Sequence, residues 1–218
     1  MRDGQRDAVA DVRTVGTPVG DARITWHRAG RARAVLALGH GAGGGVEAPD
    51  LVTLAGALPA RGVTVALVEQ PWRVAGKRLA PAPRTLDAAW TALWPALAGE
   101  GPPVVAGGRS AGARVACRTA SALGARAVLA LSFPLHPPGR PERSRAGELA
   151  GAGVPVLVVQ GGNDPFGRPE EFPEGTELVA VPEADHGFAV PKRAAVGRET
   201  ALGTAAGAAA AWLDRLPL

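Results

Sequence analysis

Short apolar runs that alternate with amphipathic segments constrain the fold of this chain most strongly. The runs lie at residues 34–38, 63–68, 103–106, 127–131, 154–159 and 177–181. Several of them are apolar throughout, which is typical of parallel strands covered by helices on both faces. Most are separated by segments with apolar residues at helical spacing, namely 51–60, 86–97, 111–123 and 202–216. This alternation predicts an α/β fold with a mostly parallel sheet and right-handed crossovers.

The length of 218 residues suits one α/β domain better than two. Residues 1–20 mix charges, Gly and Pro without periodicity, so we expect an edge segment or a loose arm there and the folded domain over residues 21–218. Residues 22–27 alternate in polarity, which predicts a half-buried antiparallel strand at the edge of the sheet. We expect Asp50 to cap the helix that follows it. Pro95 is expected to bend or end its helix.

The composition argues against several classes of protein. Lys and Arg number 24 and the net charge is +4, but the basic residues form no run, and the chain has no Tyr and only four Phe. Nucleic-acid binding is therefore not expected. One cysteine excludes an internal disulfide or thiolate cluster. No apolar stretch has the length of a signal peptide or membrane span, so we expect a cytoplasmic protein. No metal or cofactor is implied, and the oligomeric state is left open.

Residues 104–112 combine a buried run, a tight turn and the start of a helix. Ser110 lies in this turn between Gly108 and Gly112, in a G-x-S-x-G pattern. Such a turn presents the serine Oγ to a pocket above the sheet, which makes Ser110 a candidate nucleophile. The alternative is an ordinary strand-to-helix turn with a serine cap. Arg109, beside the serine, is a candidate pocket residue that faces either a substrate or a neighbouring loop.

A serine nucleophile needs a base, and the chain offers four histidines. His27 lies in the expected edge strand, where a satisfied or solvated side chain is the usual role. His40 opens a glycine-rich loop and is expected to shape it. His136 could border the pocket, but no acidic residue lies between Ser110 and His136 that would suit the expected order. The remaining histidine, His186, directly follows the last apolar run and is the candidate base.

The base requires a carboxylate that sets its tautomer. Asp164 follows the run 154–159 and therefore lies at the carboxyl end of a strand. The order Ser110, Asp164, His186 is the one expected for this architecture. Asp185 competes for the role, but adjacent side chains seldom face each other, and a local turn or cap is the more natural function for it.

Two loops could complete a pocket. In the loop that begins with His40 and Gly41, glycines leave backbone N–H groups free to point inward, and the N–H groups of Ala42 and Ala111 are the candidate oxyanion donors. A flexible loop is the alternative. The second loop, residues 70–84, carries Trp72 and four basic residues that either recognise an anionic group or face solvent.

With these motifs together, the chain resembles compact α/β-hydrolases of the dienelactone-hydrolase-like branch, and more closely the testis-expressed-protein-type subgroup. The resemblance runs from about residue 34 to the C-terminus and rests on residues 40–44, 108–112, 161–164 and 185–188. It implies a single α/β-hydrolase domain with about seven strands and no large lid, a triad of Ser110, Asp164 and His186, and a small ester-like substrate. Dienelactone hydrolases proper have a cysteine nucleophile where this chain has serine.

A binding or scaffold protein that keeps the fold without the chemistry is the alternative function. Fold does not determine function. A vestigial site would break the contact of His186 with Ser110 or with Asp164, whereas a working hydrolase needs both contacts.

Overall fold

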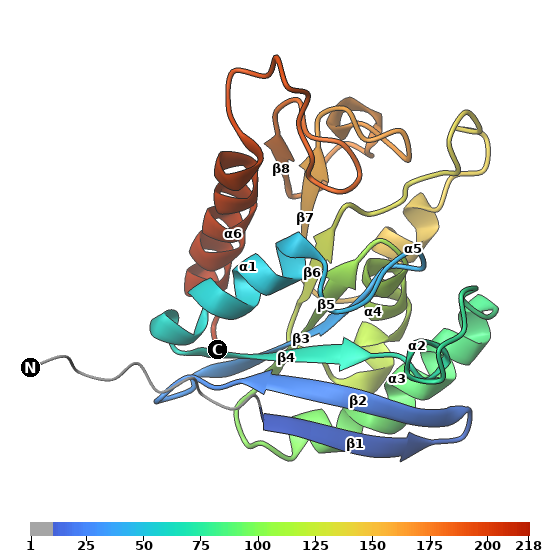
Figure 1. Ribbon diagram of the computed structural model, residues 1–218, viewed down its shortest axis with the longest axis vertical. Helices are drawn as coiled ribbons and strands as arrows, with labels where there is room; N and C mark the ends of the chain where they lie inside the picture. Colours follow the sequence, from blue (N-terminus) through green and yellow to red (C-terminus); the bar gives the residue numbers. More distant parts are fainter. Residues whose placement is uncertain (1–10) are drawn as a thin grey trace, which may run out of the picture.

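An eight-stranded sheet in the order β1-β2-β4-β3-β5-β6-β7-β8 runs through the protein (Figure 1). The structure is a computed structural model and describes residues 11–218. Neighbouring strands are parallel except in the pairs β1–β2 and β2–β4. The predicted mostly parallel sheet is therefore confirmed, with eight strands where about seven were expected. The strands are β1 (Asp11–Thr17), β2 (Gly20–His27), β3 (Ala34–Gly39), β4 (Val63–Glu69), β5 (Val104–Arg109), β6 (Val128–Leu131), β7 (Val156–Gly161) and β8 (Leu178–Val181).

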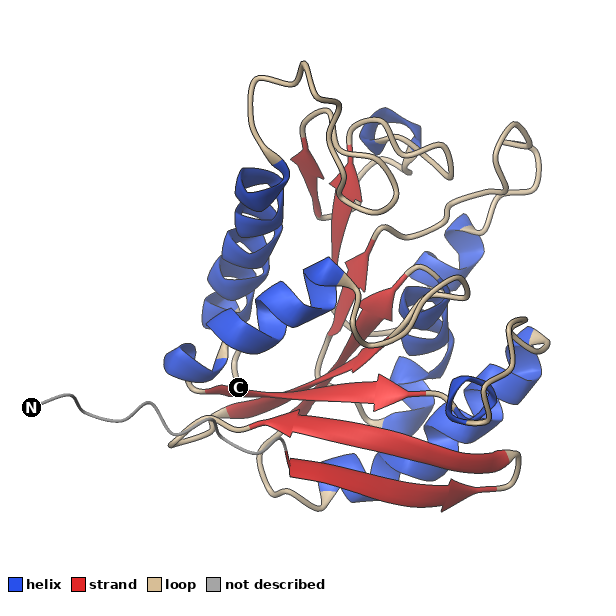
Figure 2. Ribbon diagram, in the orientation of Figure 1, coloured by secondary structure: helices blue, strands red, loops and turns tan. Residues whose placement is uncertain are grey.

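Helices cover both faces of the sheet (Figure 2). Alternate residues of β3 show the division, because Val35 and Ala37 join one buried apolar cluster and Leu36 and Leu38 join the other. The first cluster contains α3 (Pro83–Ala98) and α4 (Ala111–Leu123), with the short α2 (Pro71–Val74) and α5 (Ala146–Ala150) beside it. The second contains α1 (Pro49–Ala57) and α6 (Arg198–Arg215). Two single turns, η1 (Pro59–Arg61) and η2 (Pro169–Glu171), complete the described elements.

The N-terminal hairpin corrects one expectation. β2 is antiparallel as predicted, but it lies between β1 and β4 and is not an edge strand. The side chains of β1 are mostly exposed, so its sequence shows no hydrophobic pattern. Gly20, at φ 115°, supports the tight turn that joins the two strands. Residues 1–10 of the expected arm lie outside the described residues.

Asp50 does not cap its helix. Pro49 occupies the first helical position and Ala48 is the cap residue, so α1 begins earlier than predicted. The fixed φ of proline suits this first position, which moves Asp50 into the first turn of the helix. Its side chain is buried there. Asp50 is consequently free to take part in a tertiary contact.

Pro95 neither ends nor interrupts α3, which continues to Ala98. An interior proline costs about 3 kcal/mol or more. Leu93 and Leu97 are fully buried around it, and Trp94 is 7% exposed. Burying side chains of this size stabilises by about 1.5–3 kcal/mol each, so packing offsets the missing hydrogen bond. The expected loop 70–84 is shorter than predicted, because α2 and the first two residues of α3 lie within it.

Strand β5 extends three residues beyond its predicted end at 106, through Gly107 and Gly108 to Arg109. Glycine is disfavoured in strands, which is why the sequence pattern places the end too early. A Cβ atom at Gly107 would lie 2.8 Å from the carbonyl oxygen of Leu129 on β6. The close approach of β6 requires glycine here, and Ser110 follows the strand without an intervening loop.

Candidate active site

Ser110 occupies a strained turn between β5 and α4. Its φ of 53° and ψ of −112° are unusual for a residue with a side chain, and such conformations cost about 1–3 kcal/mol. Glycines on both sides make the turn possible. A Cβ at Gly108 would lie 2.5 Å from the carbonyl oxygen of Gly39, and a Cβ at Gly112 would lie 2.5 Å from the carbonyl carbon of Gly39. Close packing of α4 and β5 against the end of β3 therefore holds Ser110 at the carboxyl ends of the parallel strands.

The structure brings Ser110, His186 and Asp164 together from three different loops. The distance from His186 Nε2 to Ser110 Oγ is 2.9 Å, and that from His186 Nδ1 to Asp164 Oδ2 is 2.7 Å. A carboxylate only accepts hydrogen bonds, so Nδ1–H donates to Asp164 and Nε2 is left to accept from the serine hydroxyl. Asp164 is fully buried, whereas the His186 side chain is 19% exposed. The histidine can thus reach both the serine and solvent.

Asp164 is held by two donors besides the histidine. Gln160 Nε2 donates to Oδ2 at 2.8 Å, and the N–H of Phe166 donates to Oδ1 at 2.8 Å. Gln160 is itself fully buried and contacts the carbonyl of Gly167 at 2.8 Å. The sequence analysis missed Gln160. Its signal was a polar residue directly after an apolar run that should be buried on both faces.

The ring of His186 also has a defined neighbour. Phe166 lies beside it with ring centroids 4.3 Å apart and an interplanar angle of 33°. Asp185 closes a local turn, in which its Oδ1 accepts hydrogen bonds from the N–H groups of Gly187 and Ala189 at 2.8 and 2.9 Å. The predicted turn role of Asp185 is the one that the structure supports.

Arg109 faces neighbouring parts of the protein. Its Nη2 donates to the carbonyl oxygen of His186 at 2.6 Å, and its Nε lies 3.1 Å from Asp50 Oδ2. The second contact is ionic and is not a well-aligned hydrogen bond, since neither atom has a hydrogen-bond partner within residues 11–218. Burial raises the pKa of the Asp50 carboxyl, and the positive charge of Arg109 opposes that rise. Arg109 thereby links α1, the serine turn and the histidine segment.

The two candidate oxyanion donors border the same small cavity. Ala111 begins α4, and the first N–H groups of a helix have no acceptor inside the helix. Ala42 lies in an exposed turn after β3. Both residues border a small cavity of about 10 Å³, which His40, Gly41 and Trp72 also line. Three of the expected pocket residues are therefore present at this position.

His40 ties the glycine-rich loop to the end of β4. Its Nδ1 lies 2.9 Å from the carbonyl oxygen of Gly41, and its Nε2 accepts the backbone N–H of Gln70 at 3.1 Å. An accepting Nε2 requires the neutral tautomer with the proton on Nδ1. Burial lowers the pKa of His40, in agreement with this neutral state. The ring also contacts Trp72, with centroids 5.5 Å apart.

His136 has a different environment from the one expected. Its Nε2 lies 2.9 Å from Glu171 Oε2 on η2, and its Nδ1 contacts the carbonyl of Pro137 at 2.9 Å. Both acceptors raise the pKa of His136, and the carbonyl of Pro137 has the larger effect. His136 does not line the small cavity beside Ala42 and Ala111. It anchors the loop after β6 to η2.

The strand order, the strained serine turn after β5 and the histidine after β8 are those of an α/β-hydrolase fold. The chain belongs to the alpha/beta hydrolase domain family, whose model matches residues 32–214. A search of curated proteins finds no match. The helices described between residues 11 and 218 lack the combined length and hydrophobicity that a membrane span requires.

Solved structures share this fold at low sequence identity. An α/β serine hydrolase without a lid from Xanthomonas campestris has a TM-score of 0.72 at 18% identity, with 99% of each chain covered. An α/β serine hydrolase homologue from Coxiella burnetii has a TM-score of 0.73 at 16% identity, covering 93% of this chain and 97% of that one. A dienelactone hydrolase from Anabaena variabilis has a TM-score of 0.70 at 20% identity, covering 95% and 97%. All three are similar in fold.

Proposed function

We propose that this protein is a serine hydrolase that cleaves an ester or a similarly activated acyl bond of a small substrate. The observation that carries the proposal is the pair of contacts made by His186, 2.9 Å to Ser110 Oγ and 2.7 Å to Asp164 Oδ2. They provide a base for the serine and a carboxylate for the resulting imidazolium. The strained backbone of Ser110 further supports a functional role.

In the proposed reaction, Ser110 Oγ attacks the carbonyl carbon while its proton passes to His186 Nε2. The tetrahedral intermediate collapses as the C–O bond to the alcohol breaks, and the alcohol leaves with that proton. Water then attacks the acyl-enzyme, with His186 again accepting a proton and returning it to Ser110 Oγ as the acid departs. The N–H groups of Ala42 and Ala111 are the proposed donors to the oxyanion in both steps.

The alternative of an inactive scaffold expects one of the two His186 contacts to be broken. Both are present, which favours the hydrolase. The fold shared with a lidless serine hydrolase supports a small, open pocket and short substrates. Membership of the testis-expressed-protein-type subgroup, a cytoplasmic location and the absence of nucleic-acid binding are further proposals that rest on the sequence.

Covalent labelling by a fluorophosphonate probe tests the nucleophile. We expect the wild-type protein to be labelled and Ser110→Ala to remain unlabelled. Equal unfolding temperatures of the two proteins would show that the variant is folded. A panel of p-nitrophenyl esters of increasing chain length then tests turnover, with a preference for short chains expected. Equal labelling of both proteins, or no turnover across the panel, would contradict the proposal.

Asp164→Asn tests the carboxylate separately from the nucleophile. An amide that donates to Nδ1 favours the wrong histidine tautomer, and the expected loss of kcat is about 10⁴-fold. Asp185→Asn is the matched control on the adjacent carboxylate and is expected to retain activity. Comparable losses of kcat in both variants would show that Asp164 is wrongly assigned as the carboxylate partner of His186.

A further inference from the structure

Strand β7 carries one fully buried polar side chain. Gln160 follows the apolar residues 156–159 of the strand. Strands covered on both faces usually carry apolar side chains, and the glutamine leaves its Oε1 without a hydrogen-bond donor within residues 11–218. An unpaired buried acceptor lowers the stability of a fold. Packing therefore does not explain Gln160, and its role lies in the contacts of the amide nitrogen.

Three acceptors fix the orientation of the Gln160 amide. Its Nε2 lies 2.8 Å from Asp164 Oδ2, 2.8 Å from the carbonyl oxygen of Gly167 and 3.3 Å from that of Phe133. A flipped amide would place Oε1 against the same three oxygens, which only accept hydrogen bonds when Asp164 is ionised. An amide nitrogen has two hydrogens, and the two shorter contacts use both of them.

The contact with Asp164 falls on the oxygen that faces the histidine. Oδ2 also accepts the Nδ1–H of His186 at 2.7 Å, whereas Oδ1 accepts the N–H of Phe166 at 2.8 Å. His186 and Phe166 lie on loops, so of these three donors only Gln160 belongs to a strand. Groups carried by regular elements hold a site more precisely than groups on loops.

We propose that Gln160 is a positioning residue of the proposed triad, which holds Asp164 Oδ2 where it receives the Nδ1–H of His186. This inference rests on the proposed function and adds to it the group that fixes the carboxylate. The alternative is a purely structural role, in which Gln160 only joins the loops of Gly167 and Phe133 and its loss affects stability alone.

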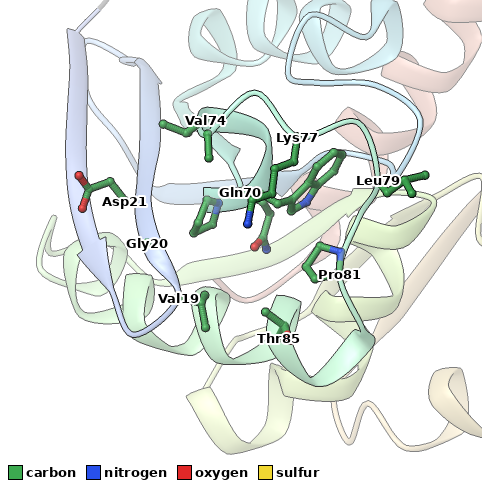
Figure 3. Close-up of a pocket in the computed structure, with 12 residues that line it drawn as sticks. Val19, Gly20, Asp21, Gln70, Val74, Lys77, Leu79, Pro81 and Thr85 are labelled. Atoms are coloured by element: carbon green, nitrogen blue, oxygen red, sulfur yellow. The ribbon is translucent and has the colours of Figure 1, made fainter.

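The chain offers a matched control in a second buried glutamine. Gln70 directly follows β4 and is among the residues that line a cavity of about 320 Å³ beside α2 (Figure 3). Its Nε2 contacts the carbonyl of Leu86 at 3.4 Å and no residue of the triad. Gln70→Met therefore removes a buried amide, keeps the backbone and leaves the contacts of Asp164 intact.

An NMR measurement tests the position of Asp164 without any substrate. A proton held between imidazole and carboxylate resonates far downfield, and its absence in Asp164→Asn assigns it to His186 Nδ1–H. In Gln160→Met, which is close in size and lacks the donor, we expect this signal to broaden because the looser contact exchanges faster with water. Gln70→Met should leave the signal as in the wild-type protein.

Turnover of a short p-nitrophenyl ester provides the second measurement. Gln160→Met should lower kcat about 10- to 100-fold, the value of a hydrogen bond to a charged group, with KM nearly unchanged. Gln160→Glu should retain more of kcat than Gln160→Met. Two carboxyl groups this close cannot both ionise, and Asp164 keeps the charge because two other donors hold it, so the new acid donates its proton to Oδ2.

The order of these two variants separates the two roles, because an apolar methionine suits a buried strand better than a carboxyl group does. The inference is overturned if Gln160→Met leaves the downfield signal unchanged, or if Gln160→Glu retains no more kcat than Gln160→Met. If Gln160→Met does not fold, Gln160→Glu decides alone, since its signal should persist at neutral pH and broaden in alkali as the new carboxyl ionises. No turnover by the wild-type protein would refute the proposed hydrolase, and the NMR signals would still decide whether Gln160 positions Asp164.

Discussion

Replacing Arg109 by leucine tests how the segment that carries His186 is held. Arg109 makes two contacts that a leucine cannot replace, an ion pair with Asp50 and a hydrogen bond to the carbonyl of His186 at 2.6 Å. The contact with Asp50 contributes to the stability of the fold, whereas the contact with the His186 carbonyl positions the proposed base. The two effects can therefore be measured separately.

The structure gives the size of each effect. The Asp50 side chain is 2% exposed and that of Arg109 16%. Breaking a buried pair costs about 3–5 kcal/mol, and we expect the lower end because the contact is poorly aligned and Asp50 can take up a proton. A hydrogen bond from a charged donor contributes about 1.5–3 kcal/mol. If its loss displaces His186, kcat falls about 10- to 100-fold.

Urea unfolding and ester turnover provide the assays, with Arg109→Leu/Asp50→Asn as the matched control. The single variant should lose about 3 kcal/mol at pH 8 and less at pH 5. The sign follows because an unpaired, buried Asp50 has a raised pKa in the folded state, so stability falls as the pH rises through that pKa. The double variant should regain stability but not kcat.

Two results would refute this reasoning. A loss below about 1 kcal/mol in the single variant would mean that Asp50 needs no buried partner. Recovery of wild-type kcat in the double variant would mean that the contact with the His186 carbonyl does not position the base.

Two further predictions concern the serine turn and the glycine-rich loop. Gly108→Ala should cost more than about 3 kcal/mol in urea unfolding or prevent folding, because its Cβ would lie 2.5 Å from the Gly39 carbonyl oxygen. The control Gly124→Ala, at φ 67° in open space, should cost only about 1–2 kcal/mol. Equal costs would exclude the close approach to Gly39 as the cause. Because burial lowers the pKa of His40, wild-type stability should fall as the pH drops below about 6.5, and His40→Gln should flatten that dependence. An unchanged slope would contradict a neutral His40.

The sheet and most helices followed from local patterns. Apolar runs predicted the parallel strands, and their boundaries were nearly right in β3 and β4, which are apolar almost throughout and carry no glycine before their last residue. The failures occurred where tertiary packing overrides local preference. Glycines in β5 are required by the neighbouring strand, and Pro95 remains helical because α3 is buried around it.

The same division applies to the candidate site. The order of Ser110, Asp164 and His186 relative to the apolar runs already placed each residue at a strand end, because the carboxyl ends of parallel strands meet at one edge of a sheet. Their hydrogen-bond partners were not predictable in this way. Gln160 and Arg109 act through side-chain directions, which depend on the final packing of the loops.

The sequence by itself determined the class of fold and a short set of chemically suitable residues, since hydrophobic periodicity and motif order are properties of neighbouring positions. Only the tertiary structure decided which of them touch. Arg109 reaches Asp50 and the His186 carbonyl across large separations in the chain, and His136 pairs with Glu171 away from the small cavity. Such contacts depend on how α1, η2 and the loops after β5 and β8 fit against the sheet, which no local pattern encodes.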